Sequence, residues 1–373
     1  MRSYGPNPLT VVISLLALCA LLGYFLLRTF QPSAAMPVDC PTLLREADYP
    51  SIIALPPGQQ NIPSVQLNPS LDANQPLAFV QVENQTNSRH SLDVYLYGCS
   101  MQETIQRLTP TLTPLFQQHD LLQGTASITS AHTLSIGELD PTLTENIRIL
   151  MQPWQQMLYH EYRWLNNGFV QIPFPSVYPV LSRAEGEQLQ QQANDGTQLP
   201  WSDPLTTVST MAQQLLHWPT ASTHIVVRDQ SDTTAHVTLT LDESTLGLDV
   251  TLQRLIQSDQ NGIWFVTTAA SPGLNLDQSS LNAPISSPMV INGKLTTSQS
   301  KLIPSARLFD HTLTRLAVLN ADALTLQSNG DFHGTLHYTN DLPGQPSLLL
   351  LSFTPPGEDS SPNALLLTNV LLS

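Results

Sequence analysis

The apolar positions of this chain begin with one long uninterrupted run and follow shorter periods after it. Leu9 to Leu27 (LTVVISLLALCALLGYFLL) carries no charged residue and lies between Arg2 and Arg28. A helix rises about 1.5 Å per residue, so roughly 20 such residues cross the hydrocarbon core of a bilayer, which is about 30 Å thick. The pattern predicts an uncleaved transmembrane anchor within residues 1–28. The alternative is a removed signal peptide, which has a shorter apolar core and a cleavage site of small residues.

Prolines interrupt any regular period in residues 29–76. Helices and central strands do not tolerate proline at this density, because each proline removes a backbone N–H donor. We therefore predict an extended, proline-rich stalk at 29–76 that holds the globular part off the bilayer, with one short helix around residues 42–46. The alternative is an irregular segment that packs along the first domain.

The pattern at 77–180 mixes strands and helix, which predicts an α+β domain. Residues 77–82 and 92–97 are rich in β-branched and aromatic residues, and the polar stretch between them favours a turn. We expect these two strands to form a hairpin. Residues 125–134 have the composition of a third strand.

Helical spacing follows within the same domain. Residues 140–141 (Asp-Pro) are typical of a helix start, and apolar residues then recur at helical intervals from Thr142 to Trp164. Pro153 must kink or split this predicted helix. Residues 169–178 contain prolines that cannot donate to a ladder, so we expect an edge strand or an extended arm there.

Residues 181–272 begin with two helical patterns and end with strands. Ser182 and Glu185 have the spacing of a capping box, which starts a helix to about Ala193, and a second helix begins at Asp203 and ends near Trp218. A curved antiparallel sheet is then predicted, with strands at 223–228, 234–241, 248–257 and 262–269.

The last of these strands begins with the sequence GIWFV at 262–266. Together with the order of two helices followed by a sheet, this G-x-W-x-V strand resembles the nuclear-transport-factor-2-like fold of many secreted and lipoprotein modules. The resemblance implies a cone-like α+β domain at 181–272. Trp218 and Trp264 would then line a pocket for a small apolar ligand, or belong to a filled core.

Residues 273–284 have the composition of a linker, and a different pattern begins after them. Residues 286–294 (SSPMVINGK) resemble the S-P-x-x-V-x-G opening of the immunoglobulin-like C-terminal domain of bacterial sporulation and spore germination proteins. Residues 331–336 (DFHGTL) resemble the F-x-x-x-L strand of the same family. Two positions depart from the family pattern: Ile291 fills the position after Val290, and the turn at 310–313 lacks its glycine.

Short strands separated by Gly, Pro and Asn turns independently predict a β-sandwich at 285–373. The predicted fold class is therefore a multidomain chain, with an N-terminal transmembrane helix, α+β domains and a C-terminal all-β immunoglobulin-like sandwich. The resemblance implies a role in the cell envelope, in the context of sporulation or germination.

The composition of the chain indicates its cellular compartment. The chain has 14 Lys and Arg against 29 Asp and Glu, a net charge of −15. Nucleic-acid phosphates and anionic lipid head groups repel such a body, which excludes nucleic acid as a partner. A surface poor in Lys and rich in Thr, Ser, Gln, Asn and Pro favours an extracytoplasmic location. Arg2 and Arg28 balance each other, so the positive-inside rule does not decide the orientation.

The cysteines agree with this location. Cys19 lies within the apolar run, which leaves Cys40 and Cys99 for a disulfide in an oxidising compartment. The alternative is two unpaired buried thiols. A further hypothesis makes Cys99 a thiol nucleophile, because His119 and Asp120 are near it in the sequence.

Motifs for other chemistry are incomplete. His160-Glu161 begins the H-E-x-x-H zinc motif, but Trp164 stands in place of the second histidine. His333 and His337 would lie about 13 Å apart on a strand, too far to share one metal. The chain has no G-x-S-x-G elbow, P-loop or G-x-G-x-x-G. We therefore expect no metal site, no cofactor and no enzymatic activity.

Aromatic residues gather between positions 154 and 178, among them Trp154, Tyr162 and Trp164. Such side chains supply large contact areas for a glycan or a peptide, and they also form cores where a helix packs on a sheet. With Trp218 and Trp264, these are the predicted binding residues.

The sequence thus predicts a single-pass bacterial membrane protein whose bulk lies outside the cytoplasm and acts, without catalysis, in cell-envelope interactions. Its predicted partners are the membrane, through Leu9 to Leu27, and an envelope protein or glycan. The alternative is an extracytoplasmic module that binds a small molecule or glycan. A thiol hydrolase that uses Cys99 is the less favoured alternative.

Overall fold

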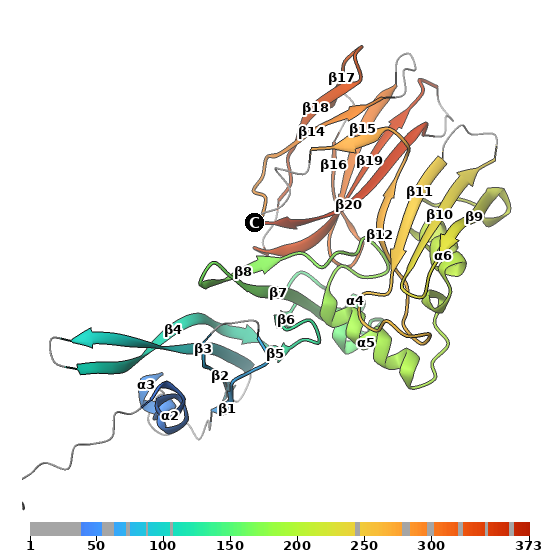
Figure 1. Cartoon of the computed structure of the whole chain (residues 1–373). Coiled ribbons are helices and arrows are strands. Elements are labelled where there is room, and N and C mark those ends of the chain that lie inside the picture. The colour runs from blue at the N-terminus through green and yellow to red at the C-terminus, as the bar shows by residue number, and fades with distance from the viewer. Residues whose placement is uncertain are drawn as a thin grey trace, which may run out of the picture.

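The computed structural model describes residues 39–53, 63–71, 75–86, 89–104, 107–242, 247–277, 284–296, 302–319, 324–339, 342–357 and 362–373. Strands predominate over helices in these ranges and form several antiparallel sheets. The N-terminal sheet and the C-terminal strands lie at opposite ends of an elongated molecule (Figure 1). The described ranges contain no helix that is long and apolar enough to span a membrane, and the run from Leu9 to Leu27 lies outside them.

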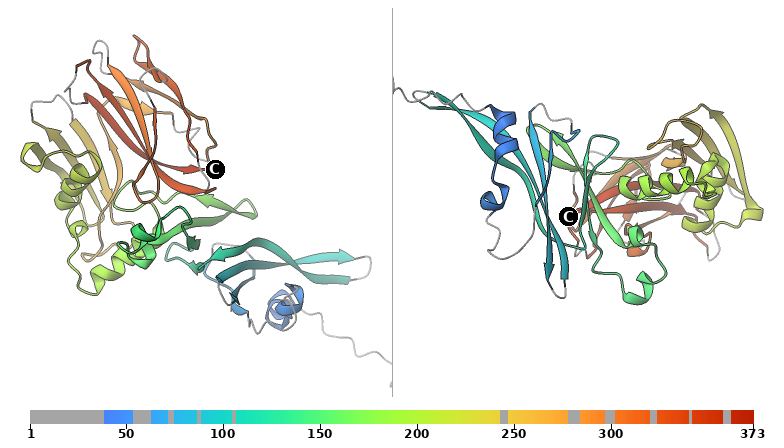
Figure 2. Two further views of the ribbon diagram at one scale, coloured as in Figure 1. Left: turned by 180° about the vertical axis from the view of Figure 1, so that it is seen from behind. Right: turned by 90° about the horizontal axis from the view of Figure 1, so that it is seen from below.

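A long hairpin dominates the N-terminal sheet. Its strands, in spatial order, are β1 (Ser64–Leu67), β2 (Leu77–Thr86), β3 (Arg89–Thr104) and β4 (Arg107–Leu122). β3 and β4 project away from the rest of the molecule (Figures 1 and 2). The predicted strands at 77–82 and 92–97 lie in β2 and β3 and pair with each other.

Two short helices, α2 (Cys40–Glu46) and α3 (Tyr49–Ile52), lie against this sheet. The Asp39 carboxylate caps α2 by accepting a hydrogen bond of 2.8 Å from the backbone N–H of Thr42. Leu44 and Tyr49 are buried among side chains of β2 and β3, and the Tyr49 hydroxyl donates to the Leu44 carbonyl at 2.6 Å.

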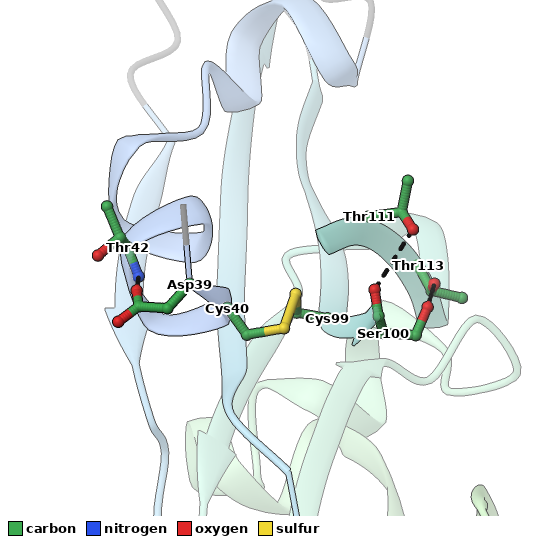
Figure 3. Close-up of a disulfide and its surroundings, with 7 residues drawn as sticks. All are labelled: Asp39, Cys40, Thr42, Cys99, Ser100, Thr111 and Thr113. Carbon is green, nitrogen blue, oxygen red and sulfur yellow. Dashed lines mark hydrogen bonds between the residues drawn. A yellow bond between two sulfur atoms is a disulfide. The ribbon is translucent and has the colours of Figure 1, made fainter. Parts of the chain in front are cut away.

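A disulfide fixes α2 to the sheet. Cys40, the first residue of α2, is bonded to Cys99 of β3, with the two Cα atoms 5.5 Å apart (Figure 3). This is the pairing expected from the sequence. Residues 39–53 therefore do not form an extended stalk, because the disulfide and the buried side chains hold them along the first sheet.

A second sheet follows, formed in spatial order by β5 (Thr125–Ile128), β6 (Leu134–Leu139), β7 (Met157–Leu165) and β8 (Gly168–Ile172). It packs on the N-terminal sheet, where the rings of Phe116 and Tyr162 meet edge to face with centroids 4.9 Å apart. β8 is an edge strand, and residues 173–178 continue from it as an extended segment, here called the arm.

The predicted helix at 142–164 is wrong. Only α4 (Glu145–Arg148) and the 3₁₀ turn η1 (Pro153–Gln156) are helical. Of the apolar pattern, Leu158 and Trp164 belong to β7, and Leu150 and Met151 lie in the turn between α4 and η1. Pro153 cannot continue a helix, and β7 satisfies its backbone by pairing with β6 on one side and β8 on the other. This tertiary pairing outweighs the helical spacing.

Two helices and four strands come next, and the helices begin at the predicted caps. α5 (Arg183–Asn194) is capped by Ser182 and α6 (Pro204–Leu215) by Asp203, whose side chains accept hydrogen bonds from backbone N–H groups of the first turn. Two 3₁₀ turns flank α6, η2 (Pro200–Ser202) and η3 (Thr220–Ser222). The strands are β9 (Thr223–Gln230), β10 (Thr234–Leu241), β11 (Gly247–Gln253) and β12 (Phe265–Ala270). The apolar side of α6 packs on this sheet, with Val208 and Met211 fully buried.

The C-terminal strands form two sheets that pack face to face. They are β13 (Leu274–Leu276), β14 (Met289–Leu295), β15 (Ile303–Phe309), β16 (Arg315–Leu319), β17 (Leu324–Leu326), β18 (Asp331–Leu336), β19 (Gln345–Thr354) and β20 (Ala364–Leu372). The small sheet has the order β13-β14-β18-β17. A shared core joins it to β15, β19 and β20, with Phe332 and Phe353 in contact at a centroid distance of 5.1 Å.

One continuous sheet replaces the two separate ones expected from the sequence. This large sheet has the order β16-β15-β19-β20-β12-β11-β10-β9, because β12 pairs with β20 through Ala269↔Leu367 and Ala270↔Leu366. The predicted linker at 273–284 contains β13, which carries the chain directly from the large sheet into the small one.

Candidate functional site

The five predicted binding aromatics do not come together in one site. Trp218 and Trp264 belong to the core under α6 and are 6% and 1% exposed. Trp154 packs on a second core beside Phe265. Tyr162 and Trp164, both in β7, do belong to one aromatic cluster. Tyr162 contacts Phe116 of the N-terminal sheet, Phe116 contacts Phe169 of β8, and Phe169 contacts Trp164, each pair edge to face.

The structure separates Cys99 from the histidine that would activate it. Cys99 faces Leu112 in the β3–β4 register, and His119 lies seven residues further along β4, about 23 Å away at the rise of a strand. The His119 ring instead contacts the Tyr95 hydroxyl at 3.3 Å. Cys99 is bonded to Cys40, so its sulfur is not a free thiol.

The His160-Glu161 pair lies in a buried polar junction between the second sheet and α5. Glu161 Oε1 accepts hydrogen bonds from Arg183 Nε at 2.8 Å and from the Thr133 hydroxyl at 2.7 Å. Both charged side chains are less than a tenth exposed. Burial lowers the pKa of His160 to about 4, so this imidazole is neutral at physiological pH.

A second buried pair connects this junction to the C-terminal strands. His311, in the turn after β15, contacts Asp140 Oδ2 through its Nε2 at 2.8 Å, and the two side chains are 3% and 2% exposed. Burial opposes a charge on His311, but the hydrogen bond with Asp140 and the nearby charges of Glu185, Asp140 and Asp310 outweigh it and raise its pKa. For Asp140, the hydrogen bonds from His311 and Thr142 outweigh burial and lower the pKa.

This junction is closed to any organic substrate. The cavity beside Glu161 measures about 10 Å³, the space of a single water molecule. Within the described ranges, no three His, Cys, Asp or Glu side chains are placed to hold a metal ion. The Glu161–Arg183 and Asp140–His311 contacts at the junction hold the second sheet to α5 and to the turn after β15.

An open groove of about 330 Å³ lies elsewhere, where the large sheet, the small sheet and the arm meet. We call it the inter-sheet groove. It is lined by Pro173, Pro175, Thr267, Thr268, Ala269, Ala270, Leu274, Asn275, Leu276, Leu366, Leu367, Thr368 and Asn369. Its volume falls at the lower end of the range for small-ligand sites in proteins.

Two features of the fold create this groove. Pairing between β12 and β20 covers only two residue pairs, because the arm pairs with β12 further along the strand, at Val266. There Val177 N–H donates to Val266 C=O at 2.8 Å, and Val266 N–H donates to Tyr178 C=O at 2.9 Å. The chain then leaves the large sheet at Ser271, whose N–H donates to the Leu365 carbonyl at 2.8 Å, and turns through Gly273 at a φ of +80° into β13.

The lining of the inter-sheet groove is neutral although the chain carries a net charge of −15. Threonine hydroxyls and asparagine amides supply its polar atoms, and Leu, Ala and Pro side chains supply its apolar atoms. The Asn369 amide is held in place because it donates to the carbonyl of Phe174 in the arm. A neutral ligand with both polar and apolar groups fits this surface, since a charged group would lose its hydration without gaining a partner.

None of the predicted binding residues lines the inter-sheet groove, and sequence patterns give almost no sign of it. Its walls come from segments about 100 residues apart in the chain, near 173, 270 and 368. The one local sign is the run TTAA at 267–270, in which small side chains directly follow the bulky residues 263–266.

No protein-family model matches this chain, and no curated protein or solved structure matches it significantly.

The His311–Asp140 pair predicts pH-dependent stability. Because the folded state raises the pKa of His311, its positive charge stabilises the fold below about pH 6.5, the value of an unperturbed histidine, and this contribution is lost as the pH rises through the raised pKa. His311→Gln keeps a hydrogen-bond donor but removes the charge. We expect it to reduce the free energy of unfolding at pH 6 by on the order of 1 kcal/mol, and by much less at pH 9.

Thermal unfolding of the wild type and the variant at both pH values measures this difference. His333→Gln, on the exposed side of β18, is the control and should change stability little at either pH. An equal loss at pH 6 and pH 9 for His311→Gln would show that the His311 charge does not contribute.

Proposed function

We propose that this chain is a non-catalytic, membrane-anchored protein of the bacterial cell envelope that binds an uncharged ligand in the inter-sheet groove. The observation that carries the binding role is the neutral, open groove of about 330 Å³ in a strongly acidic chain. Among the described residues, its lining contains no side chain that titrates near neutral pH, and the buried His, Asp and Glu residues lie in the closed junction instead. Binding therefore explains the groove better than acid–base catalysis does.

The envelope setting rests on three other observations. The run from Leu9 to Leu27 has the length and composition of a transmembrane helix. The disulfide between Cys40 and Cys99 is typical of proteins outside the cytoplasm, where thiols are oxidised. A composition that is acidic overall and rich in uncharged polar residues is typical of the same compartment.

We also propose an assignment of two domains to fold families. We assign the C-terminal strands from residue 285 to the immunoglobulin-like domain of sporulation and spore germination proteins, and residues 181–272 to the nuclear-transport-factor-2-like fold. The packed small sheet and the two helices over an antiparallel sheet support these assignments. Sporulation or germination is the context that the first of them suggests.

The location of the chain is tested by its cysteines. In intact cells whose free thiols are blocked before lysis, we expect mass spectrometry without reductant to find Cys40 and Cys99 in one disulfide-linked peptide. The cysteine within the apolar run serves as an internal control, because it has no partner in this scheme. Recovery of Cys40 and Cys99 as two alkylated thiols would contradict an extracytoplasmic location.

The binding role is tested by thermal shift. The full chain in lipid nanodiscs is heated with each member of a panel of uncharged metabolites, cell-wall fragments and short capped peptides. We expect at least one compound to raise the unfolding temperature by a few degrees, since a ligand at 100 times its Kd stabilises the folded state by about 2.7 kcal/mol.

Thr268→Trp and Thr240→Trp make a matched pair for this test. Both threonines lie on the face of the large sheet opposite α6, but only Thr268 lines the inter-sheet groove. The indole at position 268 should fill the groove and abolish the shift, and the one at position 240 should leave it intact. The absence of any shift in the wild type, or an equal shift in Thr268→Trp, would overturn the proposed binding site.

A further inference from the structure

The inter-sheet groove is bordered by a sheet edge. β13 is the outermost strand of the small sheet and pairs with β14 in the register Leu274↔Leu295, Asn275↔Lys294 and Leu276↔Gly293. All three residues of β13 line the groove. The groove thus offers an occupant not only side chains but also one side of a strand backbone.

The hydrogen bonds that flank β13 show which of its backbone groups face the groove. Thr296 N–H donates to Gly273 C=O and Asp277 N–H donates to Asn292 C=O, each at 2.9 Å. Hydrogen-bonded and non-hydrogen-bonded pairs alternate in an antiparallel ladder, so Asn275 forms the bonded pair between these two, with Lys294.

The backbone groups of Leu274 and Leu276 therefore form no hydrogen bonds with β14. Leu295 N–H agrees with this alternation, because it donates to Gly330 C=O at 2.8 Å and not to Leu274. The N–H of Leu276 and the carbonyls of Leu274 and Leu276 point to the opposite edge of β13, where the groove lies.

We propose that the inter-sheet groove takes an extended peptide segment with uncharged side chains, supplied by a partner protein, which adds to β13 as a further strand of the small sheet. This inference rests on the proposed binding function and names its ligand. Strand addition to an exposed edge is a general mode of peptide recognition, in which backbone hydrogen bonds provide affinity and side-chain pockets provide specificity.

The floor of the groove fits such a strand. A segment beside β13 would lie over β12 and β20, where Thr268, Ala270 and Thr368 leave room because their side chains are small. Three residues of β13 extend over about 10 Å, enough for two or three residues of the added strand to pair.

The chemistry of the lining selects the same occupant. A lipid chain would bury the Asn275 amide and the Thr268 hydroxyl and offer neither of them a hydrogen bond, which is unfavourable. Charged side chains would lose hydration for the same reason. Backbone amides and small or hydroxyl-bearing side chains satisfy both the polar and the apolar parts of the surface. The net charge of −15 outside the groove adds a preference for a partner segment with basic flanks.

Hydrogen exchange with mass spectrometry tests this inference on the full chain in nanodiscs. The probe is a library of N-acetylated, C-amidated octapeptides with a terminal Lys at each end and inner positions drawn from Ala, Val, Ser, Thr, Asn and Gln. We expect saturable protection within residues 265–277, with exchange at the Leu276 amide slowed at least tenfold. Thr268→Trp should remove this protection, and Thr240→Trp should not.

A second library with the same side chains but N-methylated inner amides isolates the backbone contribution. Its inner nitrogens cannot donate to the carbonyls of Leu274 and Leu276, and their methyl groups keep the peptide backbone from approaching β13 closely enough to accept from Leu276 N–H. We therefore expect it to give no protection at Leu276. Equal protection by both libraries would overturn strand addition. Protection that appears without peptide and grows with protein concentration would assign the edge to a second copy of this chain and overturn a separate partner.

The panel of uncharged compounds separates the failure of this inference from the failure of the proposed function. If neither peptide library protects β13 but a panel compound stabilises the wild type and not Thr268→Trp, the groove binds a different ligand and only the peptide inference is wrong. If no peptide and no compound acts through Thr268, both are wrong.

Discussion

The pairing of β12 with β20 is the constraint on which the arrangement of this molecule depends. Two residue pairs, Ala269↔Leu367 and Ala270↔Leu366, join strands that are about 100 residues apart into one eight-stranded sheet. The core under α6 consequently includes Leu348 and Leu350 of β19, far beyond the strands that α6 precedes. The inter-sheet groove exists because this pairing stops where the arm reaches Val266 and where the chain turns into β13.

A few buried polar contacts set the position of the second sheet against this large sheet. Glu161 with Arg183 connects β7 to α5, and Asp140 with His311 connects the end of β6 to the turn after β15. Gln171 of β8 adds a hydrogen bond of 2.6 Å to the carbonyl of Gly344, just before β19. Removing one partner of a buried ion pair is more costly than losing an apolar contact, because the remaining charge stays desolvated. These contacts therefore specify one arrangement of the second sheet against the large sheet. The arm continues from β8 of the second sheet, so the same contacts position the arm at the inter-sheet groove.

Local signals in the sequence identified those parts of the fold that depend on neighbouring residues. Ser182 and Asp203 cap their helices as predicted, and the pairing of Cys40 with Cys99 followed from the position of the third cysteine within the apolar run. The helix predicted at 142–164 was wrong because its residues find strand partners on both sides, which helical spacing cannot reveal. The aromatic residues between 154 and 178 gave no single binding site, since they divide between two packed clusters, one with Tyr162 and Trp164 and the other with Trp154.

The inter-sheet groove could not be predicted from the sequence, and the reason is physical. A groove of neutral side chains has no motif, because threonine, alanine and leucine carry no chemistry that demands a fixed spacing. Its position depends on β12 pairing with β20 rather than with a strand close in sequence. The edge of β13 was equally hidden, since 273–284 has the composition of a linker and its first residues pair with a strand, β14, that begins only after that linker.

Hydrogen exchange at two adjacent backbone amides of the unliganded full chain measures whether the outer edge of β13 is open. We expect the Asn275 amide, bonded to β14, to exchange slowly, and the Leu276 amide, which faces the groove, to exchange at a rate close to that of an unstructured peptide. Fragmentation that resolves single residues separates the two amides. Equal, strong protection of Asn275 and Leu276 would show that the edge of β13 is already occupied, and would contradict an open groove at the boundary of the two sheets.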